Sequence, residues 1–474
     1  MTRFWLCTAA VTVLTGFNVL WRLPSTTIWD LDEARYGVAA SEMLRAHQYL
    51  VPTYAGRPEY WNLKPPLGYW LLEASYHLLG RSVLALRLPS ALSALAVVWL
   101  TMLLCKHSVG RRAAILAGLM VGTCYGFLSN HGARSGGLDA ELALLMTAGL
   151  MMVPKLRGSG TARLAWGGLL GLGFLLKSFA ILPFVLAAAI YFVTESERPR
   201  WSMRPWLPAT AVFVGIVGSW ALLRTLHDGT PYFIERMTSE DLLMRASHNI
   251  DGAASLPWSY AVGLGDRFAP WPLFVFAFIG RTRPSLSLQH RATLKLLLLW
   301  ALLPLALFSL ARTHHHWYLD PTYPAWAILA AYAVLKTFRL MPWRIALACS
   351  ALALLTCEVR LVGHIVLREQ RPQSQTFLMS LRPQGPGRES LLSTFPLEYS
   401  QRFILQVLDG FAVHEPAYNG IPVPDCRARV ILRRGTGGEL VVESQRDIPP
   451  RADGLVVNPA LSRAGEKYMN RSTP

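Results

Sequence analysis

Residues 83–104 read VLALRLPSALSALAVVWLTMLL, a run of 22 residues with one charged side chain, Arg87. About 20 apolar residues in a helix span the hydrocarbon core of a bilayer. Because similar blocks recur, the sequence predicts a polytopic α-helical membrane protein. We expect about eleven transmembrane helices, near 4–21, 83–104, 113–130, 138–153, 164–176, 179–193, 206–223, 268–280, 294–311, 319–336 and 345–366. The first block lacks a small-residue cleavage site, so we expect a retained helix and not a signal peptide.

The composition supports this class and excludes others. Of 474 residues, 52% are hydrophobic and 16% charged, whereas soluble domains carry about 25% charged residues. A net charge of +17 first suggests nucleic acid, but Lys and Arg lie in short clusters between apolar blocks, as in cytoplasmic loops. We therefore exclude nucleic acid as a partner. The six cysteines show no CxxC or Cys/His spacing, so no disulfide framework is implied.

The Lys and Arg of the short loops predict the orientation. The clusters lie in 106–112, 155–163, 198–204, 281–291 and 337–344, whereas the alternating loops 131–137, 177–178 and 312–318 carry one each. By the positive-inside rule, the side of the membrane with the Lys and Arg clusters is cytoplasmic. The N-terminus is then inside, and the loops 22–82 and 224–267 and the C-terminus are extracytoplasmic.

A change of composition near residue 367 predicts the domain boundary. Residues 1–366 form the expected transmembrane domain, which includes the long first loop 22–82. Beyond it, Pro, Gly, Ser, Gln and Arg enter, and short apolar runs at 428–432 and 440–442 alternate with turns. We expect residues 367–474 to form a small extracytoplasmic α/β domain.

The first loop carries an unusual set of charges. Asp30, Asp32 and Glu33 lie within four residues, and a carboxylate in a partly dry site can accept a proton from a hydroxyl. Lys64 precedes Pro65-Pro66, which fix an extended backbone that presents the ammonium in one direction, as suits a phosphate. The alternative is a solvated loop with unrelated charges.

Later loops on the same predicted side add further polar residues. These are Arg134, Asp139, Lys177, Arg312, His314, His315, His316 and Tyr318. Ionisable residues at the ends of spans often only snorkel to the interface. Together, however, an acidic and a basic set on one face suggest an anion-binding cavity with a base beside it.

Four motifs occur in order: Asp32-Glu33-Ala34-Arg35-Tyr36, Tyr49-Leu50-Val51-Pro52, Lys64-Pro65-Pro66-Leu67-Gly68-Tyr69-Trp70 and Arg87-Leu88-Pro89-Ser90-Ala91. This pattern resembles the bacterial lipid A aminoarabinose transferases and their relatives, the protein O-mannosyltransferase superfamily with the GT-C membrane fold. Three later elements agree: Arg134 with Leu138-Asp139, Leu176-Lys177-Ser178 (Thr-Lys-Gly in the family), and Tyr318 with Tyr323-Pro324-Ala325. The matches cover roughly residues 20–330.

The resemblance implies a chemistry. A sugar would pass from a polyprenyl phosphate donor to a hydroxyl or phosphate of lipid A, a glycan, a lipid or a protein. The transfer would invert the anomeric centre of the sugar and need no nucleotide. It would take place on the extracytoplasmic side of the bacterial inner membrane. Asp32 matches the base, with Glu33 beside it and Asp139 as a second acidic residue. The expected phosphate ligands are Lys64, Lys177, Arg134 and Arg35, and the expected cavity residues are Tyr36, Tyr60, Tyr69, Arg312, His314 and Tyr318.

Two departures from the family leave the sugar and the acceptor open. Leu63 stands where a Glu usually precedes Lys-Pro-Pro, and His314 and Trp317 fall where a Lys and a His usually precede the Tyr. His314 and His316 are candidate ligands of a divalent metal, although adjacent histidines on a regular element point in different directions. The alternatives to a transferase are a transporter or flippase of lipid-linked substrates and a non-catalytic assembly subunit. The absence of an internal repeat and the intact Asp32 and Lys64 argue against them.

Overall fold

The computed structural model describes residues 2–60, 62–129, 131–195, 204–248, 256–281, 288–337, 342–367, 370–381, 389–415, 430–435 and 439–444. The chain forms two compact units. Unit 1 comprises residues 1–23, 63–68 and 87–369, and unit 2 comprises residues 24–62, 69–86 and 370–474.

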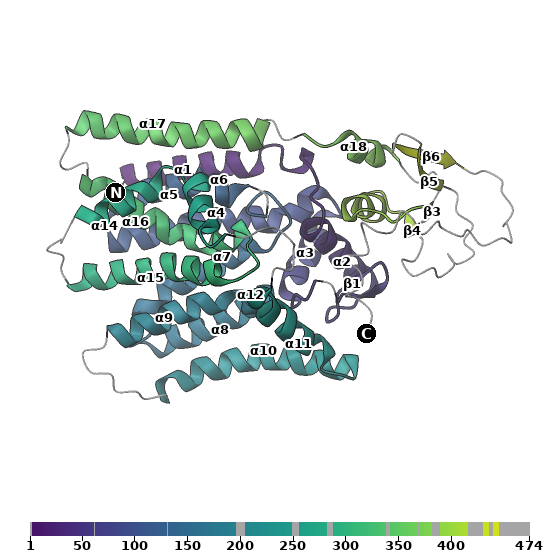
Figure 1. Cartoon of the computed structure of the whole chain (residues 1–474), viewed down its shortest axis with the longest axis horizontal. Coiled ribbons are helices and arrows are strands. Elements are labelled where there is room, and N and C mark those ends of the chain that lie inside the picture. The colour runs from purple at the N-terminus through teal and green to yellow at the C-terminus, as the bar shows by residue number, and fades with distance from the viewer. Residues whose placement is uncertain are drawn as a thin grey trace. The chain divides into compact units, whose positions relative to one another are not determined.

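The long helices of unit 1 carry the apolar blocks of the sequence (Figure 1). Each of the eleven predicted spans overlaps one of the longer helices. These helices are α1 (Thr2–Leu20), α4 (Val83–Ser108), α5 (Arg111–Gly122), α7 (Asp139–Met152), α8 (Gly160–Lys177), α9 (Leu182–Thr194), α10 (Leu207–Asp228), α14 (Trp271–Arg281), α15 (Leu288–Leu310), α16 (Tyr323–Thr337) and α17 (Trp343–Leu361). Within the described ranges, five helical stretches are long and apolar enough to cross a membrane, at 3–25, 83–108, 160–194, 204–228 and 291–310. The count of eleven transmembrane helices stays a prediction.

Shorter elements connect the long helices of unit 1. They are α6 (Tyr125–Leu128), η2 (Val153–Lys155), η3 (Ser178–Ile181), η4 (Arg204–Trp206), α11 (Tyr232–Arg236), the π-helix η5 (Met237–Met244), α12 (Arg245–Ser247), α13 (Ser259–Arg267), η6 (His316–Thr322) and the π-helix η8 (Val362–Leu367). The turn η1 (Leu23–Ser25) follows α1.

Helices α8 and α9 form a hairpin with Lys177 at its tip. Arg157, which precedes α8, donates to the carbonyls of Phe192 and Glu195 at the end of α9, so the two helices run antiparallel. Ser178 turns the chain with φ 45° and ψ −123°. Positive φ favours glycine, which accounts for the Gly that the resembling family has at this position.

Helices α8 and α10 approach closely because small residues lie between them. A Cβ at Gly167 would clash with the carbonyl oxygen of Ala209 and lie 2.9 Å from its carbonyl carbon. A Cβ at the next residue, Gly168, would lie 4.0 Å from its nearest neighbour, a methyl group of Val212. Backbone atoms cannot move aside as a side chain can, so the contact at Gly167 fixes the separation of the helices.

Gly167→Ala is therefore expected to destabilise unit 1 by about 1–3 kcal/mol, the usual cost of overpacking. Gly168→Ala is the matched control, because it adds the same methyl group to the same helix in open space. Thermal unfolding of the detergent-purified protein should show a lower midpoint for Gly167→Ala only. Equal midpoints for both variants would contradict the close approach of α8 and α10.

Unit 2 joins the first loop to the C-terminal segment. Its N-terminal part contains α2 (Asp32–Ala46), the hairpin β1 (Thr53–Tyr54) and β2 (Arg57–Pro58), and α3 (Leu67–Leu79), which begins in unit 1. Its C-terminal part contains α18 (Gln373–Ser380), α19 (Tyr399–Arg402) and the π-helix η9 (Phe403–Leu408). The backbone N–H of Ser400 donates to Asp30 Oδ1 over 2.6 Å, and Gln406 donates to Glu42 over 2.6 Å.

These contacts group the chain differently from the predicted domains 1–366 and 367–474, and that domain division stays a prediction. The sequence placed residues 22–82 with the transmembrane domain, whereas most of this loop packs with the segment after 370 in one unit. The reason is burial, because the apolar face of α2 needs a partner: Gly37 of α2 lies against the ring of Phe403 in η9.

The C-terminal part also contains a mixed sheet with the strand order β4-β3-β5-β6. Strands β3 (Ser390–Ser393), β4 (Ala412–His414) and β5 (Val430–Arg434) are parallel, and β6 (Leu440–Ser444) is antiparallel to β5. The predicted apolar runs fall on β5 and β6, although Ala428 and Arg429 lie outside the described residues, as does Cys426. A separate C-terminal α/β domain stays a prediction.

Candidate functional site

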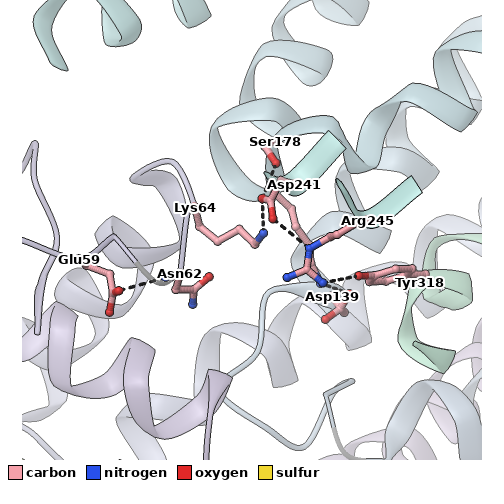
Figure 2. Close-up of polar contacts among 9 residues, drawn as sticks. Glu59, Asn62, Lys64, Asp139, Ser178, Asp241, Arg245 and Tyr318 are labelled. Atoms are coloured by element: carbon pink, nitrogen blue, oxygen red, sulfur yellow. Dashed lines mark hydrogen bonds and ion pairs between the residues drawn. The ribbon is translucent and has the colours of Figure 1, made fainter. Parts of the chain in front are cut away.

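Lys64 and Asp241 form the centre of a polar cluster in unit 1. Lys64 lies on the extended segment before α3, and its Nζ donates to Asp241 Oδ2 over 2.5 Å. The other oxygen of Asp241 accepts a bond of 3.1 Å from Nε of Arg245, one turn further along the chain. One carboxylate therefore bridges two cations (Figure 2).

Two hydroxyl groups extend this cluster. Ser178 Oγ, at the tip of the α8–α9 hairpin, donates to Asp241 Oδ2 over 3.3 Å. Nη1 of Arg245 donates to the hydroxyl of Tyr318 over 3.3 Å (Figure 2). The cluster thus gathers side chains from the first loop, the hairpin tip, the second long loop and the segment before α16.

Burial and charge act together on the central pair. Burial lowers the pKa of Lys64 below its ordinary value, and the attraction of Asp241 opposes this shift without cancelling it. Burial alone would raise the pKa of Asp241, but Lys64 and Arg245 together hold it below its usual value. Asp241 is therefore an anion at neutral pH, held by two cations.

Lys177 and Asp139 form a second buried ion pair. Lys177 Nζ donates to Asp139 Oδ1 over 2.5 Å, and both side chains are almost fully buried. Asp139 begins α7, where the helix dipole favours a negative charge. Lys177 also repels Lys64 electrostatically, so the two ion pairs lie in one electrostatic neighbourhood.

Loss of one partner of the pair between Lys177 and Asp139 should destabilise the protein strongly. Removing one partner of a buried pair costs about 3–5 kcal/mol, because it leaves an uncompensated charge. Lys177→Met is expected to lower the unfolding free energy by this amount, and Asp139→Asn added to it should restore most of the loss. Denaturant titration in mixed micelles measures both effects.

The pair between Lys295 and Glu195 is the matched control. It has a similar distance of 2.9 Å, but its side chains are 35% and 28% exposed. Exposed pairs contribute about 0–1 kcal/mol, so Lys295→Met should change little. Equal losses for Lys177→Met and Lys295→Met would show that burial of the first pair is unimportant.

Asp320 is a third acidic residue near this pair, and the motifs did not indicate it. It is 1% exposed, and neither carboxylate oxygen has a hydrogen-bond partner in the described part of the chain. Asp139, Lys177 and Arg267 are the charged groups that act on it. In the sequence, the feature that could have indicated Asp320 is its position two residues after Tyr318. A buried carboxylate without a partner is costly, which marks Asp320 as a functional candidate.

Asp32 and Glu33 form the first turn of α2 in unit 2. Asp32 is half-buried, whereas Glu33 is buried and accepts the backbone N–H of Trp29 over 2.8 Å. Glu33 thereby ties the chain before α2 to its first turn, and both carboxylates benefit from the helix dipole. Of the two, Asp32 is the more accessible for proton transfer.

Arg35 lies in an aromatic cage of unit 2. Its guanidinium donates two bonds to Glu59, of 2.5 and 2.8 Å, and lies over the rings of Tyr54 and Tyr399. Its predicted role at a phosphate is untested, and the observed contacts join α2 to β1 and α19. Tyr36 and Tyr69 are buried against each other with ring centroids 5.6 Å apart. Tyr60 is half-buried, and Trp61 lies outside the described residues.

Arg134 binds the end of α1 in unit 1. Nη1 donates to the carbonyls of Asn18 and Val19, and Nη2 donates to the carbonyl of Trp21. A cation at the C-terminal end of a helix satisfies exposed carbonyls and the helix dipole. These contacts give Arg134 a structural role, and its role as a phosphate ligand stays a prediction.

The histidines of residues 314–316 point in different directions. His314 contacts Ser259 Oγ with Nδ1 and the carbonyl of Ala311 with Nε2, at 2.6 and 2.8 Å. His315 stacks on one side of Trp317, and His131 stacks against Trp317 too. Burial lowers the pKa of His316 to about 3, helped by the positive charge of Arg267. Arg312 is exposed.

This arrangement does not gather metal ligands. Among the described residues, no group of three or more His, Cys, Asp or Glu side chains is placed to hold a metal ion. His314 and His316 as metal ligands stay a prediction.

Comparisons with known proteins agree with the motifs. The family described as dolichyl-phosphate-mannose-protein mannosyltransferase matches residues 63–221. The crystal structure of ArnT from Cupriavidus metallidurans bound to undecaprenyl phosphate superposes with a TM-score of 0.69 and 20% identity, over 87% of this chain and 86% of that one. These matches support a GT-C membrane glycosyltransferase of the ArnT and protein O-mannosyltransferase type. The predicted polytopic GT-C membrane fold is thereby confirmed.

Sequence relatives of this GT-C protein carry transferase names. The undecaprenyl phosphate-alpha-4-amino-4-deoxy-L-arabinose arabinosyl transferase 2 of Pseudomonas fluorescens is 28% identical over 76% of this chain and 62% of its own length. The corresponding enzyme of Pectobacterium carotovorum is 30% identical over 67% of this chain and 58% of its own length. The chain thus spans less than two thirds of these relatives. The family match covers Lys64, Asp139 and Lys177, whereas Asp32 precedes it.

Proposed function

We propose that this chain transfers a sugar from a polyprenyl-phosphate-linked donor to an acceptor hydroxyl or phosphate on the extracytoplasmic side of the bacterial inner membrane. The observation that carries this proposal is the cluster around Lys64, where two cations and two hydroxyl groups meet beside the buried Lys177. Such a set suits the phosphate of a lipid donor. The membrane fold and the transferase names of the relatives support the same chemistry.

The proposed reaction is a direct displacement. The acceptor oxygen attacks the anomeric carbon, the bond from that carbon to the phosphate oxygen breaks, and the acceptor proton passes to Asp32. Polyprenyl phosphate leaves with the bonding electron pair. Because the acceptor attacks from the face opposite the phosphate in a single step, the anomeric centre is inverted. Because phosphate is a good leaving group, the protein needs mainly to position the reactants and to neutralise charge.

The structure suggests one addition to the predicted residues. Lys64 and Lys177 remain the proposed phosphate anchors, and Arg245 joins them because its guanidinium shares Asp241 with Lys64 and reaches Tyr318. Asp139 would hold Lys177 in place. The roles of Glu33, Tyr36, Tyr60, Tyr69, Arg312 and His314 in the substrate cavity are proposals that follow from the resemblance.

The proposed orientation places the N-terminus in the cytoplasm and the C-terminus outside. It rests on the loop charges alone, which would put the tip residue Lys177 and both long loops on the extracytoplasmic side. The acceptor would then be a membrane lipid such as lipid A, or an envelope glycan or protein.

Mass spectrometry of envelope glycolipids, glycans and glycoproteins from cells with and without this protein tests the proposal. One sugar-modified species should disappear with the gene and return when the wild-type chain is restored. The transporter alternative predicts loss of the same species, so the second arm uses the purified chain in detergent with a polyprenyl-phosphate sugar. Product formation without a sealed membrane supports a transferase, and its absence with an active cellular phenotype would reject it. The transferase names of the relatives give the transporter no support.

A further inference from the structure

Asp241 accepts hydrogen bonds from the groups that the proposed function assigns to the donor phosphate. Oδ2 accepts from Lys64 over 2.5 Å and from Ser178 over 3.3 Å, and Oδ1 accepts from Arg245 over 3.1 Å. Two cations and a hydroxyl around an oxyanion form the arrangement expected for a bound phosphate. In this structure a side chain of the protein supplies the anion (Figure 2).

We propose that Asp241 is an internal competitor of the lipid phosphate. In the absence of donor, the Asp241 carboxylate binds Lys64 and Arg245, and it binds them again when the product leaves. This inference rests on the proposed function. It assigns to Asp241 a place in the reaction cycle that neither the motifs nor the relatives indicate.

The charges favour such an exchange. Lys64, Arg245 and Asp241 together carry one excess positive charge. A sugar linked to the lipid through a phosphodiester carries one negative charge, like the carboxylate that it would displace. After transfer, the polyprenyl phosphate is a monoester with a charge of about −1.5 to −2 at neutral pH. The cations would hold this product more tightly than the donor, so a returning carboxylate would help to release it.

The local backbone allows the carboxylate to move while the lysine stays. Lys64 is fixed by Pro65 and Pro66, which restrict its backbone to an extended form. Asp241 lies instead within the π-helix Met237–Met244, whose wide turn is less regular than an α-helix and is typical of functional sites. A change of its two side-chain torsions is enough to break the bond to Lys64.

An alternative is that Asp241 only positions Lys64. The two roles predict opposite effects of Asp241→Asn, which keeps the shape of the side chain and removes its charge. Loss of a competitor should strengthen phosphate binding, whereas loss of a positioning group should weaken it.

The matched control is Glu240→Gln. Glu240 is the neighbouring carboxylate in the same π-helix, and it pairs with Arg236 over 2.7 Å. Its neutralisation removes the same charge without a change at Lys64. Asp241→Glu is a second variant that keeps a competing anion.

The test measures binding of undecaprenyl phosphate to the purified full-length chain in detergent. Asp241→Asn should bind it roughly tenfold more tightly than the wild type, the effect of one lost charge-assisted hydrogen bond. Glu240→Gln should bind it like the wild type, whereas Asp241→Glu, which keeps a competing anion, should bind it more weakly than Asp241→Asn. With a polyprenyl-phosphate sugar that supports turnover, Asp241→Asn should lower KM and kcat together, because product release becomes slow.

The outcomes separate this inference from the proposed function. If the wild type binds undecaprenyl phosphate and Asp241→Asn binds it equally or more weakly, Asp241 is not a competitor and the inference is wrong. If neither the wild type nor any variant binds the lipid, the proposed function fails first. Thermal unfolding of each variant shows whether a loss of binding reflects misfolding. If Asp241→Asn does not fold, the affinity of Asp241→Glu for undecaprenyl phosphate tests the inference instead.

Discussion

Asp32→Asn should reduce sugar transfer roughly 10²- to 10⁴-fold, the usual contribution of a general base. Asn cannot take the proton of the acceptor hydroxyl, so the attacking oxygen would have to lose it to water. The substitution keeps the size of the side chain, and Asp32 is only half-buried at the start of α2. The variant should therefore fold and bind the donor normally. Transfer by the purified chain, with thermal unfolding as a folding check, measures both parts.

Asp30→Asn is the matched control for Asp32→Asn. It makes the same change two residues earlier, at an exposed carboxylate that accepts the backbone N–H of Ser400. The side-chain oxygen of Asn can still accept this bond, so activity should be retained. Full activity of Asp32→Asn with a defined donor would exclude Asp32 as the base. Equal losses in both variants would indicate a general need for negative charge in the loop.

The apolar blocks were sufficient to locate the helices, because burial in lipid imposes a length and a composition on each of them. They could not locate local interruptions. The third block, 113–130, becomes α5 up to Gly122 and the short α6 from Tyr125. Cys124 caps the N-terminus of α6, because its Sγ accepts the backbone N–H of Phe127. A local side-chain contact of this kind leaves the hydropathy of the block unchanged.

The pairing of the first loop with the C-terminal segment could not be predicted from either stretch alone. It depends on contacts such as Asp30 with Ser400 and Arg45 with Gln406, which join residues more than 350 positions apart. Composition gave the position of a boundary near residue 367. The composition did not indicate which part of the chain the segment after residue 370 would pack against.

The candidate site was predictable where a motif surrounds the residue. Lys64 precedes two prolines, and Lys177 lies in a short polar break between two apolar blocks, so both were apparent from the sequence. Asp241 and Arg245 lie in the second long loop without such a context, and their importance follows only from contact with Lys64 and Tyr318. Asp320 was missed because one acidic residue before a helix is common. Its burial without a partner is visible only in three dimensions.

Lys64→Gln should weaken binding of the lipid donor roughly ten- to a hundredfold, the range for loss of a charge-assisted hydrogen bond. Two effects add. The phosphate loses the ammonium, and Asp241 then neutralises Arg245 without opposition, so the cluster has no excess positive charge. KM for a polyprenyl-phosphate sugar, or the affinity for undecaprenyl phosphate, measures the loss. Lys295, which is only partly exposed and pairs with Glu195, is the control, and its change to Gln should leave binding unchanged.

Lys64→Arg separates the effect of the charge at this position from the effect of the side-chain shape. The measurement is the affinity for the donor as a function of pH. Because burial lowers the pKa of Lys64 despite the opposing effect of Asp241, the wild type should lose affinity for the donor at a lower pH than an exposed lysine would allow. A guanidinium stays charged at alkaline pH. The affinity of the Arg variant for the donor should therefore not fall as the pH rises, even if its different shape weakens binding at every pH. An alkaline loss of affinity that is the same in both variants would assign the titration to another group. Unchanged donor binding by Lys64→Gln at neutral pH would remove Lys64 from the phosphate site altogether.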